Sequence, residues 1–304
     1  MPEAVVTGLG TAMSGVDGPA GLLDVAGPGG SDTPPVDPAA RLTGRGLRYR
    51  DRATRLAMLA ASDALAAARS PDPAGPTGDD FAVVVSSNLG NVDTVCETVD
   101  VIAAQNSAMT SPMTLPSAAS NVIASWLAIR FGLRGPGLTF CNGPTSGLDA
   151  VHWARMLIRA GRASRVLVVG VEPGTPAARR LVPALFDGAV ALVMEAATHD
   201  IIPLAGIGGY RRTARPETAV AAVGETGIGL WCAANPPAAA AALDVTARFG
   251  DCSGALGVLQ CAAGVAWLSA GGVGDVVAVA GGGEPAGDDA AAALRLTPPA
   301  QDRS

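Results

Sequence analysis

Continuous apolar runs and apolar residues at helical spacing alternate along this chain. Apolar runs dominate residues 81–86, 165–172 and 187–195, which is typical of strands buried on both faces of a sheet. Apolar positions recur every three or four residues over 52–69 and 91–104, which predicts helices with one buried face. Further strands are expected at 4–10 and 201–207, and a helix at 117–130. This alternation favours an α/β fold.

One stretch joins a strand, a sharp turn and a helix. Residues 138–141 form a short apolar strand, and Asn142, Gly143 and Pro144 form the turn. Pro144 suits the first helical position, because its missing N–H would have no helical partner there. Apolar side chains at helical spacing then predict a helix with a buried face: Leu148, Val151, Ala154, Leu157 and Ile158. Many α/β enzymes hold a nucleophile on such an elbow, but here its tip carries a proline.

The same order of features occurs twice. The first copy has a glycine turn at 143–147, a helix that ends before Gly161 and an apolar strand from residue 165. The second has a glycine turn at 250–254, a helix that ends before Gly271 and an apolar strand at 275–279. Glycine after each helix suits the left-handed residue that ends many helices. The repetition predicts two structurally similar halves.

The chain resembles the β-ketoacyl synthases. The resemblance rests on the opening at 6–10 (Val-Thr-Gly-Leu-Gly), the segment 131–136 (Phe-Gly-Leu-Arg-Gly-Pro) and the elbow up to Ala150. Within the elbow, Ser-Gly-Leu-Asp-Ala at 146–150 is most similar to the chain-length factors, the cysteine-less partner subunits of type II polyketide synthases. The resemblance implies the thiolase fold, an α/β fold of two pseudo-symmetric halves, 1–195 and a shortened 196–304, in one five-layer α-β-α-β-α unit.

The reactive residues of that family are absent at the matching positions. Ketosynthases use a cysteine at the start of the central helix, where the helix dipole stabilises the thiolate, and two histidines that polarise the malonyl thioester. By the resemblance, Pro144 replaces the cysteine, Ala234 the first histidine and Asp251 the second, so no catalytic residue is expected. Chain-length factors usually carry glutamine at the position of Pro144. Asp251 would cap its helix, and the two histidines of the chain, His152 and His199, match neither histidine position.

Three residues near the elbow could replace the missing nucleophile. Thr145 and Ser146 could present hydroxyls at the start of the helix, but a hydroxyl needs an adjacent base, and no histidine is placed to serve. Cys141 lies in the strand, where its side chain should pack in the sheet. Helix capping and packing are therefore the favoured roles of these residues.

The resemblance also places the dimer interface. By it, the helix at 117–130 and the loop before it lie at that interface, beside the acyl tunnel. The candidates for lining the tunnel or the interface are Met109, Met113, Leu115, Ala118, Ala119, Phe140 and Thr145. Ordinary core packing is an equal alternative for the residues between 109 and 119.

The charge of the chain argues against a nucleic-acid partner. The net charge is −6 with a pI near 4.9, and none of the 21 basic residues is lysine, which excludes Schiff-base chemistry on lysine. The one basic cluster comprises Arg41, Arg45, Arg48, Arg50, Arg52 and Arg55. A solvated face at the start of a helix is its favoured interpretation, and a docking patch for an acidic carrier protein is the alternative.

Cysteine usage and hydropathy bear on the compartment. The five cysteines form no Cys-x-x-Cys pair, and four lie in apolar contexts, so we expect buried, reduced thiols in a cytoplasmic protein. The first residues lack a basic region, so no signal peptide is expected. The uncharged segment 254–274 is long enough to span a membrane, but its glycines and Gln260 favour a helix buried in the core. No cofactor, metal or membrane partner is expected.

The favoured hypothesis is a non-catalytic chain-length factor of polyketide antibiotic biosynthesis. It would pair with an active ketosynthase as a heterodimer, shape the acyl tunnel and work with an acyl carrier protein. Its shortened loops favour a reducing, polyene-type system. The alternative is a stand-alone acyltransferase that uses Ser146, Thr145 or Cys141 on a carrier-bound or CoA-bound acyl group. A decarboxylase that acts on a malonyl-carrier is the weakest hypothesis, because both imidazoles are absent.

Overall fold

Strands and helices alternate along the whole chain in a computed structural model that describes residues 3–24, 34–44, 47–68, 78–237, 240–282 and 290–299. The strands are β1 Ala4–Met13, β2 Phe81–Ser86, β3 Gly137–Phe140, β4 Arg165–Glu172, β5 Gly188–Ala196, β6 Ala205–Thr213, β7 Ile228–Cys232, β8 Ala241–Ala242, β9 Asp275–Gly281 and β10 Ala291–Thr297. The helices are α1 Arg52–Ala67, α2 Val92–Ala104, α3 Val122–Phe131, α4 Ser146–Arg159, α5 Pro176–Leu181, α6 Pro216–Val223, α7 Val245–Phe249 and α8 Leu256–Ser269. Short 3₁₀ turns are η1 Pro19–Leu23, η2 Pro38–Ala40, η3 Leu47–Tyr49, η4 Ser107–Met109, η5 Leu115–Ala118 and η6 Ser253–Ala255.

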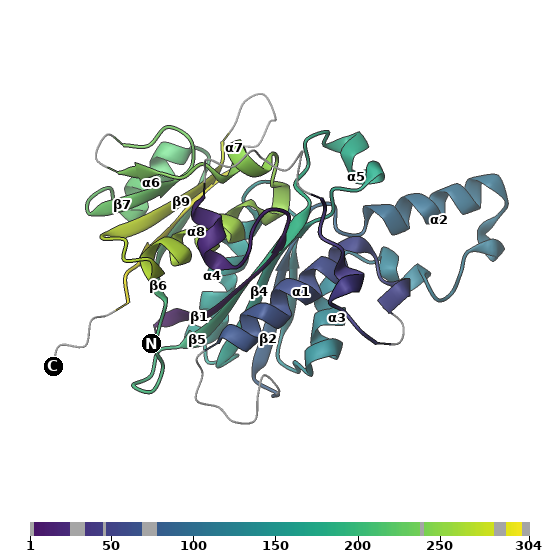
Figure 1. The fold of residues 1–304 in the computed structure, drawn as a ribbon, viewed down its shortest axis with the longest axis horizontal. Helices are drawn as coiled ribbons and strands as arrows, with labels where there is room; N and C mark the ends of the chain where they lie inside the picture. Colours follow the sequence, from purple (N-terminus) through teal and green to yellow (C-terminus); the bar gives the residue numbers. More distant parts are fainter. Residues whose placement is uncertain are drawn as a thin grey trace.

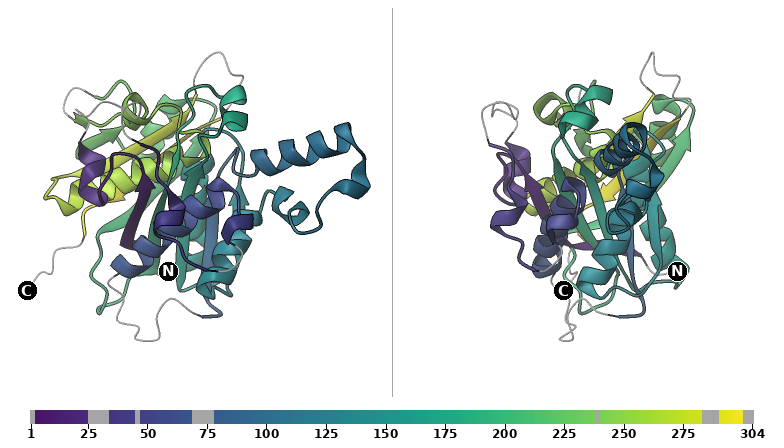
Figure 2. Two further views of the ribbon diagram at one scale, coloured as in Figure 1. Left: turned by 45° about the vertical axis from the view of Figure 1, so that its right-hand side comes forward. Right: turned by 90° about the vertical axis from the view of Figure 1, so that its right-hand side faces the viewer.

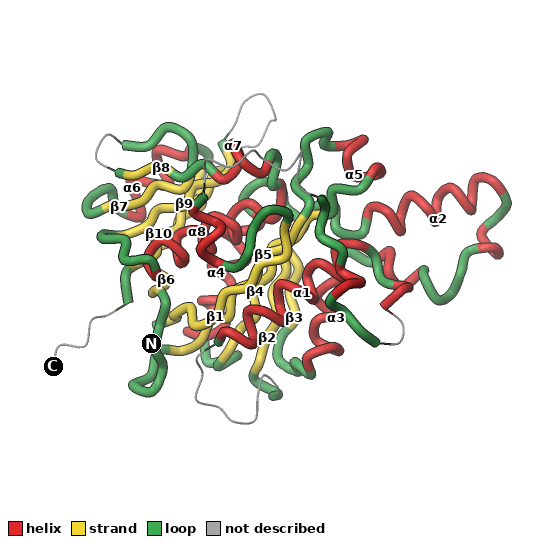
Figure 3. Tube along the Cα trace, in the orientation of Figure 1, coloured by secondary structure: helices red, strands yellow, loops and turns green. Residues whose placement is uncertain are grey.

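The strand order repeats itself about the centre of the sheet. The order is β3-β2-β4-β5-β1-β6-β10-β9-β7-β8, so the first five strands and the last five follow the same path outward from the β1–β6 pair. In both halves the outer strands are parallel and the inner ones antiparallel. Figure 3 shows the strands of the two halves meeting where β1 approaches β6. We propose the boundary between the halves in the loop that joins β5 to β6.

Alternate side chains of each strand face two different layers of helices. On β4, Val166 and Val168 face the central core with α4 and α8, whereas Leu167 and Val169 pack on the outer face with α1 and α3. In the second half, alternate residues of β9 divide in the same way between the central core and an outer cluster under α6. The layers are therefore helix, sheet, helix, sheet, helix (Figure 1), which confirms the predicted thiolase-like fold.

The two central helices cross at a pair of glycines. A Cβ atom on Gly147 of α4 would lie 2.5 Å from the backbone nitrogen of Gly257, and one on Gly257 of α8 would lie 2.2 Å from the nitrogen of Leu148. Gly147 is the last residue of the predicted turn at 143–147, and Gly257 lies three residues after the turn at 250–254. Gly147 and Gly257 thus permit the backbones of α4 and α8 to touch in the central layer.

Several predicted bounds need correction. The strand expected at 4–10 continues to Met13, and its glycines permit close packing on α1, because a Cβ on Gly8 or Gly10 would collide with the backbone of that helix. The strand expected at 201–207 begins at Ala205, and the helix expected at 117–130 begins at Val122 after η5. The helix α4 begins at Ser146 with Thr145 as its N-cap, so Pro144 precedes the helix. The predicted helix at 52–69 ends at Ala67, and Arg69 lies outside the described residues.

One segment stands away from the layered body. The helix α2 and the two turns η4 and η5 extend outward from the first half (Figures 1 and 2), and we call residues 92–121 the arm. The arm exposes large apolar side chains: Val95, Val99, Ile102, Met109, Met113 and Leu115. Among the described residues, no helix is long and apolar enough to cross a membrane.

Candidate functional site

The polar side chains of the elbow at the start of α4 are hydrogen-bonded within the chain. The Asn142 backbone N–H donates to Ser146 Oγ at 2.8 Å, and that hydroxyl lies 2.9 Å from Asn142 Oδ1 and 3.2 Å from Asn88 Oδ1 as acceptors for its proton. The Thr145 hydroxyl donates to Asp149 Oδ2 at 3.0 Å. Both hydroxyl-bearing residues are buried, so they stabilise the elbow and present no free nucleophile at its tip.

Cys141 does not pack in the sheet as expected. The strand β3 ends at Phe140, and Cys141 follows it with an exposed side chain. Once β3 has ended, no alternation of faces directs the next side chain inward. Of the other cysteines, Cys232, Cys252 and Cys261 are buried and Cys96 is half-buried, all as free thiols. Burial raises the pKa of the Cys232 and Cys252 thiols, so neither provides a thiolate near neutral pH.

Two of the three degenerate positions lie in one cavity. Pro144 and Ala234 both line a cavity of about 1110 Å³, which we call the Pro144 cavity. It opens between the start of α4, the start of α8 and the edges of β7 and β9, and Trp231 and Leu256 form part of its apolar wall. None of its described lining residues is cysteine, serine or histidine.

Asp251, the third degenerate position, lies outside the described lining of this cavity. Its side chain is exposed and accepts a hydrogen bond from the Ser253 N–H at 2.8 Å. This bond satisfies a free N–H at the start of η6, directly before α8. The N-cap positions of η6 and α8 are Cys252 and Ala255, so Asp251 binds the first N–H of η6 and does not cap the long helix as expected.

A buried carboxylate links the loop after β2 to the glycine turn at 250–254. Glu172, at the end of β4, accepts hydrogen bonds from the N–H groups of Asn88 at 2.7 Å, Leu89 at 3.0 Å and Gly254 at 2.9 Å, and from Ser87 Oγ at 3.3 Å. Burial raises its pKa to about 7, although these donors oppose the rise. Sequence reasoning missed Glu172, because a single acid at the end of an apolar strand does not reveal which loops will surround it.

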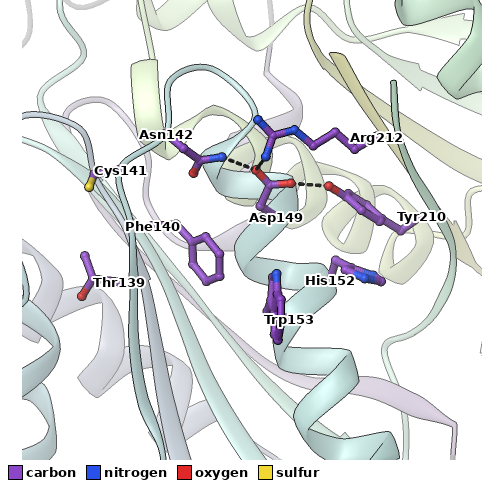
Figure 4. A pocket seen from close by; sticks show the side chains of 9 residues that line it. All are labelled: Thr139, Phe140, Cys141, Asn142, Asp149, His152, Trp153, Tyr210 and Arg212. Atoms are coloured by element: carbon purple, nitrogen blue, oxygen red, sulfur yellow. Dashed lines mark hydrogen bonds and ion pairs between the residues drawn. The ribbon is translucent and has the colours of Figure 1, made fainter. Parts of the chain in front are cut away.

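A second pocket lies on the exposed side of α4 (Figure 4). This Asp149 pocket has a volume of about 520 Å³, and its walls come from β3, the elbow, α4 and β6. The Asp149 carboxylate accepts hydrogen bonds from Asn142 Nδ2 at 2.5 Å, from Arg212 at 3.1 Å and from the Tyr210 hydroxyl. The His152 ring stacks on Tyr210 with centroids 4.0 Å apart. Burial and the nearby guanidinium of Arg155 lower the pKa of His152, so its imidazole is neutral at pH 7.

This pocket does not pair the exposed thiol with a base. Cys141 and His152 both line it, but the side chains of Phe140 and Trp153 lie between them in Figure 4. A thiol needs a base or cation within hydrogen-bond reach to be activated. The hydrogen bonds of Tyr210 and Arg212 to Asp149 instead pack β6 against α4.

The interface candidates divide between surface and interior. Met109, Met113 and Leu115 are 59%, 67% and 47% exposed, so the core-packing alternative is wrong for them. Ala119 is exposed, whereas Ala118 and Phe140 are half-buried, and Phe140 lines the Asp149 pocket. Thr145 is buried, its hydroxyl donates to Asp149, and it lines neither cavity.

The basic cluster near α1 is engaged within the chain. Arg52 pairs with Asp187 at 2.5 Å, Arg41 with Asp63 at 2.6 Å, and the Arg50 guanidinium lies 3.1 Å above the centre of the Trp126 ring. Arg45 and the side chain of Arg48 lie outside the described residues. The described contacts favour a structural role over an open docking patch. Within the described part of the chain, no three His, Cys, Asp or Glu side chains are grouped to hold a metal ion.

Comparison with known sequences points to one family. A sequence model described as "Beta-ketoacyl synthase, N-terminal domain" matches residues 36–184. Two curated relatives are named 3-oxoacyl-[acyl-carrier-protein] synthase 2. The one from Vibrio harveyi is 30% identical over 90 residues, and the one from Vibrio cholerae is 30% identical over 92 residues. Each match covers 30% of this chain and 22% of the relative, so it spans less than a quarter of the relative's length.

Solved structures match over nearly the whole chain. "The ishigamide ketosynthase/chain length factor" has a TM-score of 0.75 at 22% identity, over 97% of this chain and 99% of the other. A ketosynthase in complex with its acyl-carrier protein from a type II PKS has a TM-score of 0.77 at 15% identity, over 98% and 99%. A β-ketoacyl synthase from Burkholderia phymatum STM815 has a TM-score of 0.77 at 14% identity, over 98% and 100%. The fold and the family sequence model agree: the chain belongs to the β-ketoacyl synthase family and has its thiolase fold.

Proposed function

We propose that this chain is a non-catalytic chain-length factor, which pairs with an active ketosynthase of a type II polyketide synthase and shapes the acyl tunnel between the two subunits. The observation that carries the proposal is the Pro144 cavity. It brings together Pro144 and Ala234, which by the resemblance replace the family's cysteine and first histidine, and its described lining contains no cysteine, serine or histidine. Without a thiolate and an imidazole, neither acyl transfer to the protein nor decarboxylation has a catalyst there.

The stand-alone acyltransferase has less support. The hydroxyls of Thr145 and Ser146 are buried and bound to Asp149 and Asn142, and neither contacts a histidine. Cys141 is exposed but lies apart from His152 (Figure 4). A scaffold with intact layers, intact glycine crossing and no activated nucleophile fits a subunit that supports the chemistry of a partner.

The arm supports pairing with a second subunit. Its exposed methionines, leucine and valines form apolar surface that a free chain would leave in water. Methionine is common on surfaces that adapt to a partner, because its unbranched side chain fits irregular contacts. The similar structures include one named for both a ketosynthase and a chain-length factor and one of a ketosynthase with an acyl-carrier protein, which favours those two classes of partner.

Co-expression tests the proposal. The chain is produced together with a ketosynthase encoded beside its gene, and the mass of the product is measured by light scattering during size-exclusion chromatography. We expect a one-to-one complex that extends acyl chains on a carrier protein, and no acyl group on this chain by mass spectrometry. A chain that forms only homodimers and has no affinity for the ketosynthase contradicts the proposal, as does an acyl-enzyme at Ser146, Thr145 or Cys141.

A pair of variants tests the arm. Met113→Asp places a charge on the proposed interface, and Val273→Asp places one on an even more exposed apolar residue at the turn before β9. Burial of one large apolar side chain contributes about 1.5–3 kcal/mol, so Met113→Asp should weaken the complex by roughly 10-fold to 100-fold. Val273→Asp should leave the affinity unchanged. Equal effects of the two variants would remove the arm from the interface.

A further inference from the structure

We propose that the Pro144 cavity binds an amphipathic amine, a small molecule with an apolar body and a positively charged head. This inference goes beyond pairing with a ketosynthase, because it concerns a ligand of this chain alone. By the resemblance, Pro144 and Ala234 in its lining match the family's cysteine and first histidine, yet its walls differ from those of a site for an acidic or phosphate-bearing substrate. Three observations support the inference: the size of the cavity, the sign of its charges and an unpaired acceptor in its wall.

The cavity is large enough for a ligand and mostly apolar. Its volume of about 1110 Å³ is at the upper end of the range of sites that hold small molecules. Trp231 and Leu256 face it from β7 and α8, Ile228 and Val220 add further apolar surface, and Pro144 closes it at the elbow. An apolar chain or ring system would replace water along these walls.

The charged residues in the described lining of the cavity are all acidic. Glu217 and Glu225 are exposed side chains of the lining, and Asp244 also lines it while capping α7 through the Thr246 N–H at 2.9 Å. The described lining includes no arginine or histidine, and the chain has no lysine. Arg295 donates to the carbonyl oxygens of residues 223, 224 and 226 nearby, but it is paired with Asp275 and is not part of the lining. The local field therefore favours a cation and opposes a carboxylate or phosphate.

Gln260 provides an independent observation. The residue is 2% exposed and lines the cavity from α8. Its Nε2 donates to the carbonyl oxygens of Cys232 at 2.5 Å and Val279 at 2.8 Å, which fixes the orientation of the amide. Its Oε1 is buried and has no hydrogen-bond partner among the described residues. A buried acceptor without a donor is unfavourable, so a molecule that brings an N–H or O–H group to this wall gains a partner that the chain does not supply.

A series of eight-carbon ligands tests the charge preference. Binding of n-octylamine, n-octanol and octanoate to the full chain is measured by isothermal titration calorimetry at pH 7 without any ketosynthase, so the result does not depend on the pairing proposed above. Each exposed carboxylate within reach of a cation should change affinity by up to about fivefold. We expect octylamine to bind at least about tenfold more tightly than octanoate, with octanol between them, and added salt to narrow the difference.

Three variants locate the site. Glu217→Gln combined with Glu225→Gln should weaken octylamine binding several-fold and leave octanol unchanged, whereas Ala234→Trp should fill the cavity and remove binding of both ligands. Glu97→Gln neutralises an exposed glutamate on α2, remote from the cavity, and should have no effect. All four substituted positions are exposed, so the variants should keep their fold, and measurement of their melting temperatures verifies this. The inference is overturned if octanoate binds as tightly as octylamine, if no member of the series binds, or if Glu97→Gln weakens binding as much as the cavity variants.

Discussion

The glycine crossing of α4 and α8 makes the most direct prediction about this molecule. Gly257→Ala would place a Cβ 2.2 Å from the nitrogen of Leu148, and Gly147→Ala would place one 2.5 Å from the nitrogen of Gly257. Ordinary contacts of a Cβ lie beyond about 3.4 Å, so the helices would have to separate by about 1 Å. Because the atoms in the way belong to backbones, no side chain can rotate to relieve the clash.

The expected loss of stability in these two variants follows from two opposing effects. Overpacking of a well-packed core costs about 1–3 kcal/mol and occasionally more, and this site belongs at the upper end, because both helices lie between two sheets. Alanine favours a helix over glycine by up to about 1 kcal/mol, which offsets part of the cost. We therefore expect each variant to lose about 2 kcal/mol or more, which lowers the melting temperature by roughly 4–8 °C or more.

Urea denaturation and calorimetry measure this loss, and Gly137→Ala is the matched control. A Cβ on Gly137 would meet only Val83 Cγ1 at 3.8 Å, an ordinary contact at the edge strand β3. The control should therefore stay within about 1 kcal/mol of the parent chain. If Gly147→Ala and Gly257→Ala both unfold like the control, the close contact of the central helices is refuted.

Three further predictions concern the buried acid, the Asp149 network and the exposed thiol. Burial raises the pKa of Glu172 to about 7 from an ordinary 4.5, so its contribution to stability is present at low pH and is lost as the pH rises through 7. The free energy of unfolding of Glu172→Gln should therefore rise by about 3 kcal/mol relative to that of the parent chain between pH 4 and pH 8. Urea titrations at both pH values measure this change, and the same difference at both pH values would be the contrary result. Asp149→Asn should cost about 2–4 kcal/mol, because a buried carboxylate with charged and neutral donors is removed, whereas Asp63→Asn, whose partner Arg41 is exposed, should cost less than about 1 kcal/mol. Under native conditions iodoacetamide should modify Cys141 well before the buried cysteines, and peptide mapping that finds a buried thiol modified first would contradict its exposure.

The sequence determined the parts of this protein that depend on local pattern. Apolar runs predicted the first and last residues of β2 and β4, because a strand buried on both faces has apolar residues along its whole interior. The repeated glycine turn, helix and strand predicted two similar halves, and the strand order follows the same path in each. The family resemblance was carried by short motifs around the elbow, and the family sequence model over 36–184 includes the elbow and the 131–136 segment.

Only the tertiary structure decided which distant residues meet and which side of an element faces water. Cys141 is exposed because β3 ends one residue earlier than the apolar pattern predicted, and Met109 and Met113 are exposed because the arm leaves the body. Neither feature is visible in a pattern of apolar residues, since a buried methionine and an exposed one have the same local sequence. Glu172 and Gln260 acquire their roles from backbone groups far away in the chain, including Gly254 and Cys232. Periodicity along a chain reports which face of an element is apolar, whereas a site depends on the contacts that folding brings together.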